Sequence, residues 1–338
     1  MAKSPDNNEI VMRLTALWAF TEAGLGGVLH LFKSPFSGLM LCGLSIIFLS
    51  MIAKYSNYSS RVIIRSLVLV VFIKMLVSPH SGVTAYFAVA FQGLLAAFIF
   101  GTFKDSSLGL YLFGIIAMVE SAMQRLIVLT VLFGMQFWEA VNEFGNFVYQ
   151  LFFNHSPEGS WFSWSVVVAY LIIYALGGAF AAWLYRRISK NILTIEKSYL
   201  LSATVIEEGN PLILTDKPKK KKRKSKWSNY ILLLLLLGFT IYFSSTIADM
   251  SGVFYILLRT ILIIVVWIYI INPILLLALK KFLKKRFMEE RERAKHIQAL
   301  FPWIRQVLSE AWSKASICSG FARLENFLSW TFYLILNK

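Results

Sequence analysis

The sequence has few of the residues on which metal and redox centres depend. It contains only two cysteines and four histidines in 338 residues. Cys42 lies in an apolar segment and Cys318 in an expected cytoplasmic helix, so they form neither a disulfide framework nor a metal-ligand spacing. The histidines are scattered over helix ends and loops. We therefore expect no metal, no cofactor and no redox chemistry.

Motifs of catalysis and energy conversion are missing as well. The sequence has no GxxxxGK[ST] phosphate loop, no HExxH zinc motif and no GxSxG nucleophile turn. Without a phosphate loop the chain cannot hydrolyse ATP for transport by itself. We expect no enzyme, and the sequence leaves open only an acid/base pair that uses Glu22 or Glu120.

Charge is scarce and apolar sequence is abundant. Charged residues make up 15% of the chain and hydrophobic residues 57%, with a mean hydropathy of +0.64. Several apolar runs approach 20 residues, the length that crosses a bilayer as a helix. The composition predicts an all-α, polytopic integral membrane helical bundle. The polar N-terminus shows no cleavable signal.

The hydropathy pattern predicts about eight transmembrane helices in two modules. A six-helix module covers residues 1–186, a basic cytoplasmic linker covers 187–228, and a two-helix module with cytoplasmic amphipathic helices covers 229–338. We expect the membrane helices at roughly 12–32, 36–54, 62–79, 83–103, 108–134, 162–185, 229–248 and 253–279.

The short loops predict the orientation, because cytoplasmic loops hold an excess of Lys and Arg. Basic residues follow the second, fourth and sixth helices, whereas the loop 135–161 contains Glu139, Glu143 and Glu158 and no Lys or Arg. We therefore expect the N-terminus, the 186–228 linker and the segment after the last membrane helix in the cytoplasm.

The linker contains a concentrated basic run, "KPKKKKRKSK" at residues 217–226, whose eight basic residues equal half of the formal net charge of +16. Such a run resembles nucleic-acid patches and nuclear localisation signals. Directly before a membrane helix it more often fixes topology and attracts anionic lipid headgroups. We expect anionic lipids as its partners and no nucleic acid.

Two amphipathic, basic helices follow the last membrane helix. In "IQALFPWIRQVLSEAWSKAS" apolar residues recur at helical spacing while charged residues occupy the other side, and Pro302 suits a first helical turn. Such helices either lie on the inner leaflet or form a docking surface for a cytoplasmic partner. The sequence does not decide between these two roles.

Ionisable and polar side chains occur at membrane depth on several helices. Because each charge costs roughly 2.5–3.5 kcal/mol to insert, such groups normally face the bundle interior and pair. We expect Arg125 to pair with Glu22 or Glu120. Together the groups form either a static polar clamp or a pocket for a small polar solute in the outer half, and we favour the pocket. The candidate ligand-binding residues are Glu22, His30, Lys74, Gln92, Glu120, Gln124 and Arg125.

This organisation resembles the membrane components of energy-coupling factor (ECF) vitamin transporters. The first module looks like a substrate-binding S component, and the second is similar to a degenerate T component. In "AFTEA", Ala19 and Ala23 fit the small-residue pattern that packs on the coupling partner. The resemblance implies cytoplasmic ATPase partners, a bacterial inner (cytoplasmic) membrane, and contacts to the ATPases through Arg293, Arg305 and Arg323. Here Arg293-Ala294-Lys295 and Ala322-Arg323-Leu324 replace the Ala-Arg-Gly motif of T components.

The sequence thus predicts a membrane transport component that binds a small polar solute and relies on partner proteins for energy. The alternative is a non-transporting membrane scaffold or anchor that recruits a cytoplasmic partner through its basic helices.

Overall fold

A computed structural model of the protein describes residues 6–25, 37–78, 83–153, 159, 161–203, 238, 242, 250–271, 273–275, 277–278 and 287–337. Every regular element within these ranges is helical, which confirms the all-α class. In chain order the elements are α1 (Asn7–Phe20), the π-helical turn η1 (Thr21–Leu25), α3 (Ser37–Tyr55), α4 (Ser60–Val77), α5 (Val83–Phe103), α6 (Ser107–Phe133), α7 (Met135–Phe153), α8 (Trp161–Ala203), α10 (Met250–Val266), the π-helical turn η2 (Trp267–Ile271), α12 (Phe287–Ala299), α13 (Phe301–Lys314), the 3₁₀ turn η3 (Ala315–Ile317) and α14 (Gly320–Asn337).

Five helices in the described residues are long and apolar enough to cross a membrane, which indicates a membrane-embedded protein. They cover Gly38–Tyr55, Thr84–Phe103, Ser107–Phe133, Trp161–Glu196 and Gly252–Leu275. The expected helix 62–79 is present as α4, but Arg61, Arg65 and Lys74 make it too charged for this group. The expected span 229–248 lies outside the described residues except for 238 and 242.

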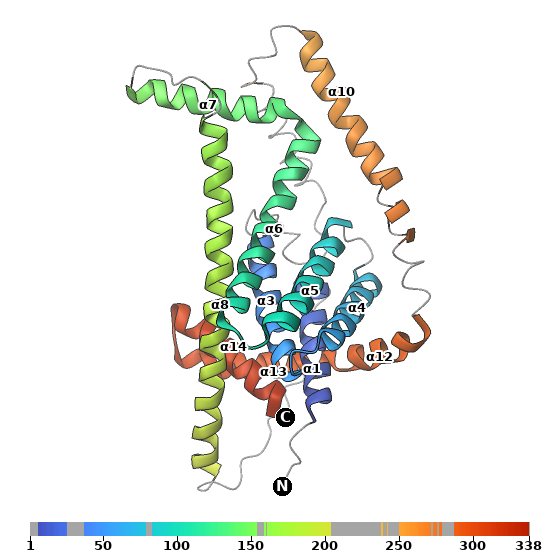
Figure 1. Ribbon diagram of the computed structural model, residues 1–338, viewed down its shortest axis with the longest axis vertical. Helices are drawn as coiled ribbons and strands as arrows, with labels where there is room; N and C mark the ends of the chain where they lie inside the picture. The colour runs from blue at the N-terminus through green and yellow to red at the C-terminus, as the bar shows by residue number, and fades with distance from the viewer. Residues whose placement is uncertain are drawn as a thin grey trace.

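The helices from α1 to α8, apart from α7, pack side by side as a bundle (Figure 1). Its tightest crossing joins α6 and α8, where Gly114 and Gly178 lie backbone to backbone. A Cβ atom on either glycine would collide with the carbonyl group of the other. Small residues at such a crossing let two membrane helices approach closely, and this approach positions the polar residues of α6 against α8.

The segment 135–161 differs from the loop that we expected. Residues Met135–Phe153 form the helix α7, which crosses the top of the bundle at a steep angle to α6 and α8 (Figure 1). The two glutamates suggested a polar loop, yet apolar residues also recur there at helical spacing. Helix α8 is longer than expected and continues to Ala203, past residue 186 at which we ended the first module.

The C-terminal helices pack on the bundle. In Figure 1, α12, α13 and α14 lie across the end opposite α7. Ile297 of α12 and Ile304 of α13 are fully buried in the same apolar core as Leu14 of α1. The Arg13 side chain of α1 donates a hydrogen bond to the Ile335 carbonyl of α14 at 3.2 Å. The protein's own bundle thus covers much of the apolar faces of these amphipathic helices, while Trp312 of α13 stays 50% exposed.

Helix α10 stands at the side of the bundle (Figure 1). Ile256 packs with Phe133 and Phe137 in a small apolar cluster, and the Thr260 hydroxyl donates to the Leu132 carbonyl at 3.4 Å. Only 12% of its candidate span is buried, compared with 56% for the span of α3. α3 therefore lies at the centre of the bundle and α10 at its edge.

Candidate functional site

Glu22 lies on the π-helical turn η1 and is closed off from solvent. Its Oε2 atom accepts a hydrogen bond from Lys74 Nζ of α4 at 2.7 Å, and its Oε1 atom accepts one from Ser45 Oγ of α3, also at 2.7 Å. The Glu22 and Lys74 side chains are 2% and 3% exposed. A π-helical turn inside an α-helix often marks a functional position, and here it places the carboxylate between two neighbouring helices.

Neighbouring polar groups extend this contact into a network. Trp18 Nε1 donates to Ser45 Oγ at 3.2 Å, and Thr15 Oγ1 donates to Ser66 Oγ at 2.9 Å. Each carboxylate oxygen of Glu22 has a charged or hydroxyl partner. The cluster formed by Trp18, Glu22, Ser45 and Lys74, which we call the closed cluster, is neutral and satisfied, as a buried ion pair must be to remain stable.

A second polar group lies on α6, and we call Glu120, Gln124, Arg125 and Tyr174 the open cluster. Gln124 Nε2 donates a short hydrogen bond to Glu120 Oε1. The Arg125 guanidinium lies beside Gly38 of α3 and within electrostatic range of Tyr174 on α8. The Tyr174 hydroxyl accepts a hydrogen bond from Tyr170 at 3.1 Å. Glu120, Gln124 and Arg125 are all partly exposed.

Two buried acceptors, one on α5 and one on α6, have spare bonding capacity. Glu120 Oε2 and Gln92 Oε1 have no hydrogen-bond partner among the residues that the structure describes, although the Gln92 side chain is only 4% exposed. A buried acceptor without a partner costs roughly 1–3 kcal/mol. Both atoms are therefore positioned to accept a hydrogen bond from another molecule.

The two acceptors that lack partners in the described part of the chain lie at a similar depth in the bundle. Gln92 and Glu120 are each roughly 15–20 Å along their helices from the loop that joins α5 and α6, at a rise of about 1.5 Å per residue. Cys42 of α3 is fully buried and lies within electrostatic range of both Glu22 and Glu120. One polar layer thus crosses the bundle, with α3 between its closed and open parts.

The structure connects two pairs of the predicted ligand-binding residues, Glu22 with Lys74 and Glu120 with Gln124, and the pairing of Glu22 differs from the one that we expected. The cation bound to Glu22 is Lys74 and not Arg125, and Glu120 Oε1 accepts a hydrogen bond from Gln124. The register between separate helices decides such pairings, and a single sequence does not contain it. His30 lies outside the described residues. The roles of Trp18, Ser45 and Tyr174 were missed, because aromatic and hydroxyl residues are common in membrane helices.

The predicted partner residues divide into two sets. Ala19 and Ala23 are 0% and 6% exposed and contact the protein's own helices, which removes them from the candidate partner surface. Arg293 and Arg305 are exposed on α12 and α13. The Arg323 guanidinium lies 4.3 Å from the centroid of the Trp312 ring, a cation–π arrangement that holds α14 against α13.

A polar contact that sequence analysis missed joins α8 to α14. Glu325 of α14 accepts hydrogen bonds from Arg187 Nε at 2.5 Å and from Asn191 Nδ2 at 2.7 Å, both on α8. The Glu325 side chain is 7% exposed. This ion pair fixes the C-terminal helices to the bundle, and its residues stand too far apart in the chain for a motif to reveal them.

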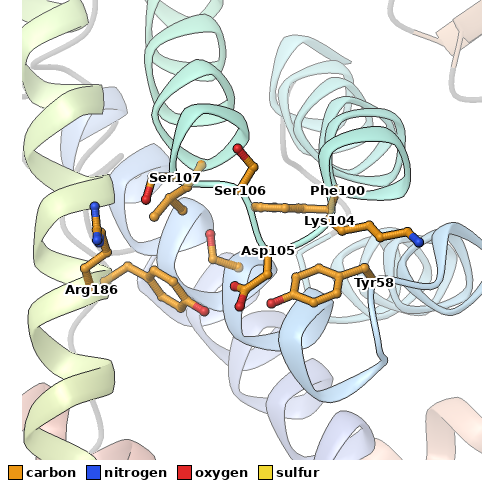
Figure 2. A pocket seen from close by; sticks show the side chains of 10 residues that line it. Tyr58, Phe100, Lys104, Asp105, Ser106, Ser107 and Arg186 are labelled. Carbon is orange, nitrogen blue, oxygen red and sulfur yellow. The ribbon is translucent and has the colours of Figure 1, made fainter.

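A cavity of about 200 Å³ opens at the end of the bundle where the α3–α4 and α5–α6 loops meet α8 (Figure 2). The Asp105 carboxylate lies next to the Tyr58 hydroxyl at its wall, while the Lys104 side chain points away (Figure 2). Burial, followed by the hydrogen bond and charge of Asp105, raises the pKa of the Tyr58 hydroxyl. Tyr58 and Lys104 have positive φ angles of 58° and 48°. This cavity is distinct from the polar layer, and we expected a pocket in the other half of the bundle.

No group of three or more His, Cys, Asp or Glu side chains suited to a metal ion occurs within the described ranges. Comparison with protein-family models, with curated proteins and with solved structures finds no match to this chain. The site must therefore be interpreted from its own geometry.

Proposed function

We propose that the chain is the membrane subunit of a transport system, binds a small polar solute at the open cluster and obtains energy from partner proteins. The observation that supports this proposal best is the pair of buried acceptors, Gln92 Oε1 and Glu120 Oε2, without partners among the described residues. A solute that donates hydrogen bonds would remove the cost of leaving them unpaired.

The closed cluster has a supporting role in this proposal. Lys74 neutralises the Glu22 carboxylate and Ser45 donates a hydrogen bond to it, so Glu22 adds no unpaired charge to the polar layer. Because the two remaining acceptors are an amide oxygen and a carboxylate oxygen, the solute should contain hydroxyl, amide or amino donors. The candidate set for direct contact narrows to Gln92, Glu120, Gln124 and Arg125.

Energy would come from outside the chain, since the sequence contains no phosphate loop. The exposed basic residues of α12 and α13, among them Arg293 and Arg305, offer a surface to a cytoplasmic ATPase or another acidic partner. In this proposal α1 with η1, α4 and the segment 229–248 complete about eight spans. The ends of α1 and α14 near the termini then face the cytoplasm of a bacterial inner membrane, with anionic lipids at 217–226, as in the ECF components that the sequence resembles.

A second candidate function is the membrane scaffold or anchor. The observation that favours it is the closed cluster itself, because a sealed Glu22–Lys74 pair at 2–3% exposure is the static clamp that a scaffold needs. The basic outer surface of α12 and α13 would then recruit a cytoplasmic protein without any solute.

Replacement of Gln92 by methionine separates the two functions. Gln92→Met keeps the side-chain volume and removes the acceptor, so a transport subunit should retain less of its co-purifying solute, by about two- to tenfold. Gln136→Met is the matched control, because Gln136 Oε1 is also buried without a partner among the described residues but lies at the α6–α7 corner. Mass spectrometry of small molecules released from each purified protein gives the readout. If the parent, the variant and the control release the same amount of solute, or none, the result would favour the scaffold.

A further inference from the structure

Helix α7 has two contrasting faces from Phe137 to Leu151. Apolar side chains recur at spacings of three and four residues on one side, and polar side chains recur at the same spacings on the other. The apolar stripe contains Phe137, Val141, Phe144, Phe147, Val148 and Leu151. The polar stripe contains Glu139, Asn142, Glu143, Asn146 and Gln150. The periodicity therefore continues beyond the point at which the bundle ends.

The bundle covers only the first half of the apolar stripe. Phe137 and Val141 are 8% and 9% exposed, because they pack against Phe133 and Ile256. Phe147, Leu151 and Phe152 are 52%, 67% and 76% exposed. In Figure 1 this second half of α7 extends past α8, away from the rest of the bundle. Three large apolar side chains within six residues would be costly to leave in water.

The neighbouring helices indicate what covers this surface. α7 begins directly after α6 and precedes α8, and both contain candidate membrane spans. The side of α8 near α7 is itself apolar and exposed, with Trp164 at 68% and Val168 at 48% exposure. The exposed stripe of α7 therefore continues the lipid-facing surface of α8 at the end of its span, where bilayers meet water.

We infer that α7 is an interfacial helix whose Phe147, Leu151 and Phe152 side chains insert between the phospholipids of one leaflet. The exposed Glu143 and Gln150 of its polar stripe face the headgroups and water, while Asn142 and Asn146 of the same stripe accept hydrogen bonds from the start of α8.

The composition of α7 indicates which kind of lipid surface it would bind. α7 contains Glu139 and Glu143 and no Lys or Arg, so binding relies on apolar insertion and not on attraction to anionic lipids. Trp138 and Tyr149 lie between the stripes, as amphipathic aromatic residues do at membrane boundaries.

This role differs from that of the basic α12 and α13 at the opposite end. There the apolar residues, such as Ile304 and Val307, are 0% and 2% exposed and pack on the protein itself. The amphipathic helices at the two ends of the bundle thus differ: most of the apolar side of α13 packs on the protein, whereas the second half of the apolar side of α7 is exposed. The inference does not depend on whether the protein binds a solute.

Spin labels on the full-length protein test the inference. The labels are placed by Phe147→Cys and, as the matched control, Gln150→Cys, each in a Cys42→Ala, Cys318→Ala background. The proteins are reconstituted in nanodiscs of zwitterionic phosphatidylcholine, and collisions with oxygen and with a water-soluble nickel chelate are measured. The label at 147 should collide mainly with oxygen, which dissolves in the bilayer, and the label at 150 mainly with the chelate.

Other patterns would overturn the inference. Equal collision of both labels with the nickel chelate would mean that α7 lies in water. Protection of the label at 147 from both reagents would mean that a protein surface, for example a second copy of the chain, covers the stripe. In nanodiscs that contain anionic lipid, the label at 147 should lie at the same depth. Insertion that occurs only with anionic lipid would contradict binding by apolar insertion alone.

Discussion

The closed and open clusters of the polar layer use the same kind of residue in opposite ways. Glu22 and Glu120 both lie on helices within the bundle, yet Ser45 and Lys74 bind both oxygens of Glu22. Among the residues that the structure describes, only one oxygen of Glu120 is bound, by Gln124. A buried carboxylate whose oxygens are both bound is tolerated within the fold, whereas one with a free oxygen keeps the capacity to bind a ligand. The difference is the basis of our proposal that one side of α3 has a structural role and the other side binds a solute.

The largest effect should come from breaking the closed cluster at its cation. Lys74→Met removes the ammonium and leaves the Glu22 carboxylate buried with Ser45 alone, which should destabilise the protein by about 3–5 kcal/mol. Thermal unfolding of the full chain in nanodiscs measures this loss. The double variant Glu22→Leu, Lys74→Met removes both charges and should recover much of the stability. A single variant as stable as the parent would show that Glu22 does not depend on Lys74.

The two glutamates should respond differently to the same small change. Glu120→Gln should weaken solute binding by roughly 1.5–3 kcal/mol, because a charged acceptor becomes a neutral one, and should leave the melting temperature nearly unchanged. Glu22→Gln leaves the Lys74 ammonium without its counter-ion, so it should lower the melting temperature. Melting curves and solute retention are measured on both variants. Loss of solute in Glu22→Gln with no loss in Glu120→Gln would reverse the roles of the two clusters.

The close crossing of α6 and α8, which lies beside the open cluster, should contribute to the stability of the bundle. Gly114→Ala introduces a Cβ atom against the Gly178 carbonyl, so the two helices must move apart at a cost of about 1–3 kcal/mol. Gly43→Ala is the control on the adjacent α3, where the new Cβ atom would only touch the flexible end of Met118. Unfolding curves should show a lower stability for Gly114→Ala than for Gly43→Ala. Equal stability of the two variants would mean that the backbones of α6 and α8 do not lie in close contact at Gly114.

The smallest effect should come from the partner of Glu120. Gln124→Leu removes one hydrogen bond to a partly exposed carboxylate, which should cost about 0.5–1.5 kcal/mol of stability at most. The variant should still change solute retention, because Gln124 holds the Glu120 carboxylate in place. Solute retention is measured by mass spectrometry beside the parent protein. Retention equal to that of the parent would show that Gln124 does not contribute to the solute site.

Much of this layout was predictable, and the unpredictable part has a common physical origin. Hydropathy located α3, α5, α6 and α8, because a membrane span must satisfy its own backbone and be apolar for about 20 residues. It did not reveal that Glu22 pairs with Lys74, since that contact depends on the packing of α4 beside η1. It did not show α7 either, because two glutamates masked its apolar periodicity.

The C-terminal helices illustrate the same limit. Their amphipathic pattern was evident in the sequence, but an apolar face does not specify what covers it. Ile304 on α13 packs into the bundle core, whereas Phe147 on α7 remains exposed. Both faces follow the same periodicity, and only the structure distinguishes a face buried by the protein from one left for another partner.

Electron cryomicroscopy of the full-length protein in nanodiscs, purified without added ligand, tests the central claim most directly. The account predicts non-protein density, larger than a single water molecule, within hydrogen-bond distance of Glu120 Oε2 or Gln92 Oε1, while Glu22 remains bound to Lys74 and Ser45. A map in which both acceptors bind protein side chains would contradict it, and so would a map in which a ligand replaces Lys74 beside Glu22.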